Sequence, residues 1–526
     1  MHFALARAMR KKGSVRSPAM MPCLLATSMA ACGIASGWAQ PASLGSTSSS
    51  DAVERAERPS AVAIERPEQK KSAHDLSDIF SAKKAQPLSP VFEHQPKEGK
   101  LSGFDFYRDP LGADRPNQDP NAILEKEAKA KPGVMAAQRR MLEQRYDLTP
   151  KLDPVAKMSR GKPLVVGPTA RLQNGVTWEK LAAMRPEDIK QQGVFPYPSL
   201  PHPLQANGGQ VFPKMQIKMF PRLERVDVDF DLPEAFIPEF PPAIYLTNRP
   251  ELGDVSRGEV VSINNYYRLF KDLLTPVQLD GLRLLLTPFA QEEFNPTDDR
   301  KTREPQLGVT CLDCHVNGHT TAQFHLNPDD RPQERRFRLD TVSLRGLFNQ
   351  QIHGSKRSLR SVEDFTEFEQ RTAYFNGDAI HAMKKGMNIL DRIQVSHMAQ
   401  FQNMLDFPPA PKLDVATGRL DHAKATDSER RGEEIFLGKG KCASCHPAPF
   451  YLDHLMHDLH VERFLDEPGD GPIKSFTLRG IKESPPYMHD GRCLTLEDTV
   501  EFFNIVLSLE LTAQEKTDLV AFMRVL

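Results

Sequence analysis

The sequence predicts a mainly α-helical protein in which two similar domains follow a long, largely irregular N-terminal extension. A short motif of two cysteines and a histidine occurs twice in the second half of the chain, and similar segments follow both copies. The last residues have the apolar spacing of a helix that packs on one face. The 43 prolines indicate long irregular stretches, and a chain of 526 residues has room for roughly two to four domains.

Composition places the chain among the globular proteins. Hydrophobic residues make up 39% and charged residues 26% of the sequence, which is typical of a chain that folds in water. The formal net charge of -1 gives no reason to expect a nucleic-acid partner.

Residues 1–39 have the pattern of an export signal peptide. Basic residues without any acidic one precede a mostly apolar run from Met20 to Ala35, and Gly37–Ala39 fits a small-x-small cleavage site. We therefore expect a periplasmic protein. The apolar run is short for a membrane span. The stretch Met29–Gly33 loosely resembles a lipoprotein cleavage box, so a lipid-anchored form facing the periplasm is the alternative.

The extension divides into two parts of different composition. Residues 40–160 contain a Ser/Thr run at Ser46–Ser50 and much charge, which predicts a disordered or poorly ordered segment. Residues 161–300 are rich in proline and aromatic residues, and the alternation at Val226–Phe230 favours extended strands or wrapping arms. Leucines between Gln278 and Phe289 predict a buried helix that leads toward the first motif.

The repeated motif is Cys-x-x-Cys-His, the attachment signature of a c-type haem, at Cys311–His315 and Cys442–His446. Two thiols three positions apart can each add to one vinyl group of a porphyrin, and the next histidine can bind its iron. A single copy would also suit a zinc or redox site, but two copies in an exported chain favour haem. We expect two covalently bound haems c. Their attachment residues would be Cys311, Cys314, Cys442 and Cys445, and their iron ligands His315 and His446.

Similar segments follow the two motifs. Leu344–Gly346 and Leu478–Gly480 both read Leu-Arg-Gly, and histidines follow at His353 and His489. We align the later segments by their Val-Glu pairs, which matches Val362–Phe365 to Val500–Phe503 and Leu359 to Leu496. The repeat predicts two tandem cytochrome c-like haem domains, at residues 301–430 and 431–526.

The last helix of the second domain is readable in the sequence. Thr512 and Glu515 have the spacing of a capping box. The apolar residues that follow at helical spacing are Leu519, Phe522, Met523 and Leu526. Cys493 belongs to neither motif, and we expect it to be a small buried hydrophobic residue.

Together these segments resemble the di-haem cytochrome c peroxidase superfamily, which includes the maturation oxidase MauG. The resemblance covers roughly residues 300–526. Besides the haem motifs, its most specific piece is Pro486–Arg492 followed by Thr495–Glu497, and Lys412–Lys439 is similar to the family's approach to its second haem. The resemblance implies an open N-terminal haem where hydrogen peroxide reacts, a C-terminal haem that passes electrons, and a calcium ion between the domains.

The chain departs from the family at the sixth ligand of the second haem. The family has Met or Tyr there, but counting from His489 this position is Phe503, which cannot bind iron. Either the second iron is five-coordinate or another side chain binds it. The candidates are His457, His460, His489 and Met488.

The family also carries a tryptophan between its haems. The repeat puts Ile352 near that position, and the predicted mature chain contains only Trp178, far upstream. An aromatic relay would then use another group, and we name Tyr374 or Phe375.

In the family a distal glutamate takes a proton from peroxide and returns it to the leaving oxygen. The matching window here holds Glu367 and Glu369, our leading candidates, with Asp364 third. Arg371 would stabilise developing negative charge. The same pattern also suits a solvated helix face. Two histidines after the first motif, His319 and His325, are further candidates for distal or propionate contacts, with a core or surface role as the alternative.

These features predict a haem oxidoreductase that activates hydrogen peroxide at the N-terminal haem and shares oxidising equivalents with the C-terminal haem. A small periplasmic cytochrome c or cupredoxin would supply electrons, or a protein substrate would be oxidised as in MauG. The alternatives are a di-haem oxygenase of the rubber-oxygenase type and a non-enzymatic di-haem electron carrier. The missing methionine ligand favours the MauG-like form, because a thioether ligand raises the potential of a haem.

Overall fold

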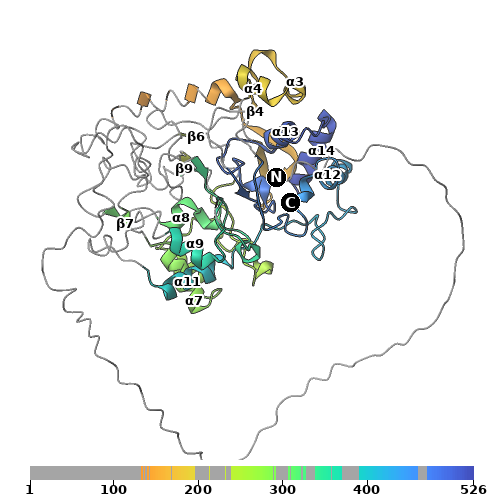
Figure 1. Cartoon of the computed structure of the whole chain (residues 1–526). Helices are drawn as coiled ribbons and strands as arrows, with labels where there is room; N and C mark the ends of the chain where they lie inside the picture. The colour runs from red at the N-terminus through yellow and green to blue at the C-terminus, as the bar shows by residue number, and fades with distance from the viewer. Residues whose placement is uncertain are drawn as a thin grey trace, which may run out of the picture. The chain divides into compact units, whose positions relative to one another are not determined.

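The computed structural model describes residues 142–166, 169–195, 239–287, 310–320, 338–356, 358–369, 390–459 and 471–526. It also describes a few residues between 129 and 140, and short strands between these stretches. Within these residues the fold is mainly helical, as the sequence predicts (Figure 1). The export signal expected at residues 1–39 lies outside the described residues, and none of the described helices is both long and apolar enough to cross a membrane.

The helices are mostly short. The α-helices are α3 (Trp178–Ala183), α4 (Pro186–Gln192), α6 (Tyr266–Phe270), α7 (Pro276–Leu285), α8 (Cys311–Cys314), α9 (Val362–Phe368), α11 (Arg392–Gln402), α12 (Asp427–Leu437), α13 (Leu496–Val506) and α14 (Ala513–Met523). The 3-10 helices are η3 (Gln173–Gly175), η6 (Pro250–Leu252), η8 (Val316–Gly318), η10 (Leu347–Asn349), η12 (Cys442–Ser444) and η13 (Ile481–Glu483).

The strands form two-stranded sheets. Five of these are antiparallel: β1 (Tyr146–Asp147) with β4 (Thr169–Ala170), β2 (Lys151–Lys157) with β3 (Pro163–Val166), β7 (Ala290–Gln291) with β8 (Gln306–Leu307), β9 (Phe324–Leu326) with β10 (Arg338–Asp340), and β11 (Met456–His457) with β12 (Ile473–Lys474). A parallel pair joins β5 (Phe212–Pro213) to β6 (Asp231–Leu232).

One helical group contains α7, α9 and α11 (Figure 1). The helix expected at Gln278–Phe289 is α7, which starts slightly earlier because Thr275 and Gln278 form a capping box. Its leucines Leu282 and Leu285 are buried against α11 and the first motif's Leu312. This packing confirms the expected buried helix beside the first motif.

A second group contains α12, α13 and α14 (Figure 1). The predicted capping box at Thr512 is present, since its hydroxyl accepts from the backbone N–H of Glu515 and the Glu515 side chain accepts in return. All four apolar residues predicted for this helix and its end are buried. Cys493 is fully buried in the same core, as expected for a small hydrophobic residue.

The Leu-Arg-Gly segments form the same turn in both repeats. Gly346 and Gly480 have φ values of 78° and 74°, and each is followed by a 3-10 helix. A Cβ atom at Gly346 would lie 2.0 Å from the ring of Phe407, and one at Gly480 would lie 2.8 Å from Pro408. Both turns therefore pack against adjacent residues of one connecting segment.

The structure also corrects the alignment of the later parts of the two repeats. The β-bridges His353–Leu359 and Tyr487–Cys493 join residues at the same spacing in the sequence. In each repeat, a hydroxyl residue two positions after the bridge, Ser361 or Thr495, caps the next helix. Leu359 therefore corresponds to Cys493 and not to Leu496.

The corrected alignment shifts the second helix by about one helical turn relative to the first. Val362 and Leu496 each begin their helix directly after the cap, so they are equivalent. Our sequence alignment paired Val362 with Val500 instead. Apolar residues recur once per turn on the buried face of a helix, so two registers four residues apart look alike in sequence.

Part of the segment that composition predicts to be poorly ordered forms structure. Strands β1 and β2 lie within residues 40–160, and Leu142 and Tyr146 are buried in the core that contains α13 and α14. Burial of these two large apolar side chains offsets part of the entropy lost when the chain becomes ordered.

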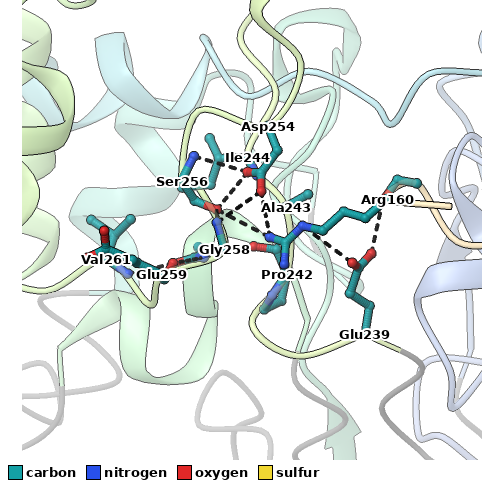
Figure 2. Close-up of polar contacts among 12 residues, drawn as sticks. Arg160, Glu239, Pro242, Ala243, Ile244, Asp254, Ser256, Gly258, Glu259 and Val261 are labelled. Carbon is teal, nitrogen blue, oxygen red and sulfur yellow. Dashed lines mark hydrogen bonds and ion pairs between the residues drawn. The ribbon is translucent and has the colours of Figure 1, made fainter. Parts of the chain in front are cut away.

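Polar contacts join parts of the extension to one another (Figure 2) and to the residue Asn317 after the first motif. Arg160 forms ion pairs with Glu239 and with Asp254, the latter at 2.7 Å. Asn317, two residues after the motif, accepts from the backbone N–H of Val261 at 2.8 Å. Its amide nitrogen donates to the carbonyl of Pro242 at 2.8 Å. The extension therefore supports the chain around the first motif.

Candidate cofactor site

The first motif forms a single capped helical turn, α8. The hydroxyl of Thr310 accepts from the N–H of Asp313, and the Asp313 carboxylate accepts from the N–H of Thr310 at 2.7 Å. This reciprocal pair starts the helix at Cys311. Cys311 and Cys314 are three positions apart in the turn, so their side chains share one face.

The histidine of the first motif is held by a backbone carbonyl. His315 donates from Nδ1 to the carbonyl of Val342 at 2.8 Å. A carbonyl only accepts, so the ring proton is on Nδ1 and Nε2 keeps the lone pair that a metal needs. Burial lowers the pKa of His315 to about 4, which keeps the ring neutral.

The second motif holds its histidine in the same way, although it begins with a 3-10 turn and not an α-helical one. Cys442 lies in the 3-10 turn η12, and His446 donates from Nδ1 to the carbonyl of Tyr451 at 2.9 Å. Burial again lowers the pKa of His446. In both copies, therefore, the fold fixes a neutral imidazole whose Nε2 can bind iron.

A cavity of about 470 Å³ adjoins the second motif. Cys442, Cys445 and His446 all line it. Its apolar lining includes Leu496, Val500 and Phe503 of α13, and Leu519 and Met523 of α14. An apolar cavity of this size with convergent thiols and one imidazole fits a haem bound through two thioethers.

Residues of the first repeat also line this cavity. Val342, whose carbonyl holds His315, is one of them. His319 is another, and its ring bonds to the hydroxyl of Ser343 at 2.8 Å and to the carbonyl of Glu483 at 2.9 Å. Both nitrogens of His319 are thus engaged, so this residue is a core histidine that joins the repeats and not an iron ligand.

Three possible metal ligands gather beside the second motif. Single ligand atoms of Cys445, Asp453 and His457 lie within 4.8 Å of one another, and His457 Nε2 is 2.6 Å from a carboxylate oxygen of Asp453. A zinc ion there would use the Cys445 thiolate, whereas haem attachment converts the same sulfur into a thioether. Burial raises the pKa of Cys445, so its thiol stays protonated without a metal. This set also lacks the oxygen-rich character that calcium prefers, and the calcium ion stays a prediction.

The predicted distal carboxylates have different surroundings. Arg392, which is 61% exposed, pairs with Glu367 and with Asp364, the latter at 3.0 Å. Glu369 follows α9 and is close enough to Cys311 for its charge to raise the pKa of that thiol, after the larger effect of burial. Of the two leading candidates, Glu369 is thus the one whose charge acts on the first motif. Arg371 lies outside the described residues.

The candidate ligands of the second iron share one cavity. Phe503, Met488, His489 and His457 all line it, whereas His460 lies outside the described residues. His489 is 6% exposed, and Met488 has a positive φ of 72°. Phe503, the residue at the position of the family's sixth ligand, therefore lines the cavity of the second motif. Tyr374 and Phe375 lie outside the described residues, and the side chain of His325 is not described.

Sequence reasoning missed the groups that orient the two histidines. Both are backbone carbonyls, at Val342 and Tyr451, and a carbonyl leaves no signature in a sequence. It also missed Lys474, which lines the cavity and is buried. A single lysine between strand residues gives no pattern that would have identified it.

Comparison with known proteins gives partial matches. No family model matches the sequence. Cytochrome-c peroxidase IdrP1 from Pseudomonas sp. (strain SCT) is 26% identical over 150 residues, which cover 19% of this chain and 40% of that protein. The methylamine utilization protein MauG from Methylorubrum extorquens is 30% identical over 152 residues, which cover 24% of this chain and 42% of that protein. The chain thus spans less than half the length of these curated relatives.

Among solved structures, a MauG-like protein associated with microbial copper homeostasis aligns with 49% of this chain and 90% of its own. The identity is 18% and the TM-score is 0.33, which is too low a likeness to support an argument. The sequence matches include a cytochrome-c peroxidase and MauG, the two members of the superfamily that the motifs resemble. Part of the chain is therefore similar in sequence to cytochrome-c peroxidases and to MauG.

Proposed function

We propose that this chain is a periplasmic enzyme with two covalently bound haems c that activates hydrogen peroxide at the N-terminal haem. Residues 301–430 and 431–526 would form two cytochrome c-like domains, the first reacting with peroxide and the second exchanging electrons. The observation that carries the proposal is the matching pair of histidines. His315 and His446 each follow two cysteines, and each donates from Nδ1 to a backbone carbonyl. The repeated Cys-x-x-Cys-His sequence supports haem attachment over a zinc or redox site at these histidines.

Glu369 is the acid–base group in this proposal. Its carboxylate accepts a proton from one peroxide oxygen and returns it to the oxygen that leaves. Two observations support Glu369 over Glu367. Its charge acts on Cys311, whereas Glu367 is paired with the exposed Arg392. When bound, the haem supplies an iron at which peroxide is reduced and a store for electrons.

Arg371 would assist by stabilising negative charge that develops on the leaving oxygen. It follows Glu369 by two residues in the sequence. Water near the first motif would be limited by the leucines of α7 and by Leu312, which are buried together. A drier site strengthens the effect of both charged groups.

The second haem would be held without the family's usual sixth ligand. Phe503 lines the cavity and offers no donor atom. The second iron is therefore five-coordinate or bound by one of the candidates His457, His460, His489 and Met488. The absence of a methionine at this position favours storage of oxidising equivalents over a high-potential electron acceptor. In that form the protein oxidises a residue of a protein substrate, whereas the peroxidase form would take electrons from a small periplasmic cytochrome c or cupredoxin.

The deciding experiment starts from periplasmic protein with its cofactors. Intact-mass spectrometry should show a mass increment of two haems, with residues 1–39 removed. Hydrogen peroxide is then added to the fully oxidised protein, and optical and Mössbauer spectra are followed. A response of both haems supports the MauG-like form. A response only after prior reduction of one haem supports the peroxidase form. One haem or none would reject the proposal.

A further inference from the structure

Lys474 is a buried cation in the cavity of the second motif. It lies in β12, which pairs with β11 so that Lys474 is opposite Met456. Its backbone N–H donates to the carbonyl of Ser355 in the first repeat at 2.9 Å. The residue is 5% exposed and lines the cavity. The backbone therefore holds this side chain between the two repeats, with its polar end away from water.

The partners of its ammonium group are neutral. Nζ donates to the side-chain oxygen of Gln350, which is also buried and lines the cavity. It also lies 4.8 Å from the ring centre of Phe476. Asp340 is the one acidic residue among the described residues lining the cavity, and no ion pair joins it to Lys474. An amide and a ring satisfy an ammonium group only in part.

The other buried cation of the cavity is already neutralised. Arg345 forms an ion pair with Glu483 at 2.7 Å, and both side chains are buried. The half-buried Arg479 donates to the carbonyls of Leu526 and Pro408. Lys474 is thus the buried cation of this wall that no described carboxylate neutralises.

An uncompensated ammonium group in such a place costs free energy. Burial lowers the pKa of Lys474 to about 7, so the isolated site disfavours the charged form. An anion entering the cavity would reverse this preference, because an opposite charge at close range favours the ammonium. A bound anionic group would therefore supply the charge partner that the described residues do not give Lys474.

We propose that Lys474 binds a propionate carboxylate of the haem that occupies this cavity. The inference rests on the proposed function, since it takes the cavity to hold a covalent haem. The thioethers formed by Cys442 and Cys445 fix one edge of the porphyrin, and its two carboxylates are the anions that arrive with it. Lys474 then joins the propionate to Gln350, and so links the haem of the second repeat to the first repeat.

This pairing has an electrostatic consequence. A cation beside the propionate offsets negative charge that would otherwise favour the oxidised iron. Lys474 therefore raises the reduction potential of the second haem. Removing its charge lowers that potential while the covalent attachment remains.

The test uses the full-length protein with its haems and three variants. Lys474→Met removes the charge, Lys474→Arg keeps it, and Lys482→Met removes a half-buried lysine that does not line the cavity. Haem content is measured by mass spectrometry, and the reduction midpoint of each haem by optical redox titration. We expect Lys474→Met to lower one midpoint only. Lys474→Arg should stay close to the wild-type value, and Lys482→Met should shift neither midpoint by a comparable amount.

The outcomes separate the two proposals. A wild-type protein without two haems rejects the proposed function itself. If wild type and Lys474→Met both carry two haems and have the same midpoints, the propionate pairing is wrong. It is also wrong if Lys482→Met lowers the same midpoint equally, because the effect is then one of general charge. A changed ligand spectrum in Lys474→Met would instead make Lys474 an iron ligand and overturn the inference.

Discussion

Glu369 and Phe503 occupy the same position in the two repeats. Each is the eighth residue after the hydroxyl residue that caps its helix, Ser361 in one repeat and Thr495 in the other. Phe503 lines the cavity of the second motif, and the charge of Glu369 acts on Cys311 of the first. One position of the repeat therefore carries an acid whose charge acts on the first motif, and an apolar ring that lines the cavity of the second.

This relationship predicts different effects for two neighbouring glutamates. Glu369→Gln keeps the size of the side chain and removes its base, so we expect the rate of reaction with peroxide to fall by roughly 100-fold or more. Glu367→Gln is the matched control, because Glu367 pairs with the exposed Arg392. Stopped-flow absorbance measures the rate for each variant. The comparison is valid when the resting haem spectrum of both variants matches that of the wild type. If both variants react with peroxide at the wild-type rate, neither glutamate is the acid–base group, and Asp364 or His325 becomes the next candidate.

The position of Phe503 predicts that an iron ligand can be introduced there. Phe503→Met places a thioether at the cavity, and we expect a methionine-ligated spectrum and a higher reduction potential for one haem. Phe503→Leu is the control, since it changes the packing and supplies no ligand. Optical and electron paramagnetic resonance spectra compare the variants. Identical spectra for the two would mean that this position lies out of reach of the second iron.

The ion pair that joins the repeats predicts a large loss of stability when it is broken. Arg345 and Glu483 are 2.7 Å apart with side chains 5% and 3% exposed. Arg345→Met leaves a buried carboxylate without its partner, and we expect a loss of about 3–5 kcal/mol of unfolding free energy. Arg392→Met, at an exposed pair, should cost less than about 1 kcal/mol. Urea unfolding measures both, and similar losses would contradict the expectation.

The tight turn at Gly346 predicts that even alanine is too large there. Its φ is 78°, and a Cβ atom would lie 2.0 Å from the Phe407 ring. Gly346→Ala should cost about 1–2 kcal/mol for the backbone and about 1–3 kcal/mol for the displaced ring. Gly193→Ala is the control, with a φ of 59° and open space around it. Thermal unfolding should show a clearly larger loss for Gly346→Ala, and equal losses would argue against the clash.

Buried His353 predicts a pH dependence of stability. Burial is the main cause that lowers its pKa to about 4, below the usual value of about 6.5. Between these values the unfolded chain binds a proton that the folded chain does not, so stability falls as the pH drops from about 6.5 to 4. His353→Gln should flatten this slope by up to one proton, about 1.4 kcal/mol per pH unit. Urea unfolding at several pH values measures it, and parallel curves below pH 6.5 would refute the prediction.

The sequence by itself determined the two Cys-x-x-Cys-His motifs, the capping box of the last helix and the mainly helical fold. Each depends on residues close together in the chain. Cys311–His315 and Cys442–His446 are readable because haem attachment requires a fixed spacing of thiols and imidazole. The capping box at Thr512 is readable because a hydroxyl residue and an acid three positions later satisfy each other's backbone.

Only the tertiary structure decided which side chains meet. Glu367 and Glu369 are two positions apart, which is more than half a turn of helix, so the docking of α9 determines which of them turns toward Cys311. The alignment of α9 in the first repeat with α13 in the second could be decided only from their capping residues. Apolar residues one helical turn apart give the same sequence pattern, so the pattern alone allows two alignments. The carbonyls that orient His315 and His446, and the burial of Lys474, come from segments distant in sequence or from the backbone itself. Folding brings those groups together, and no local pattern of residues records it.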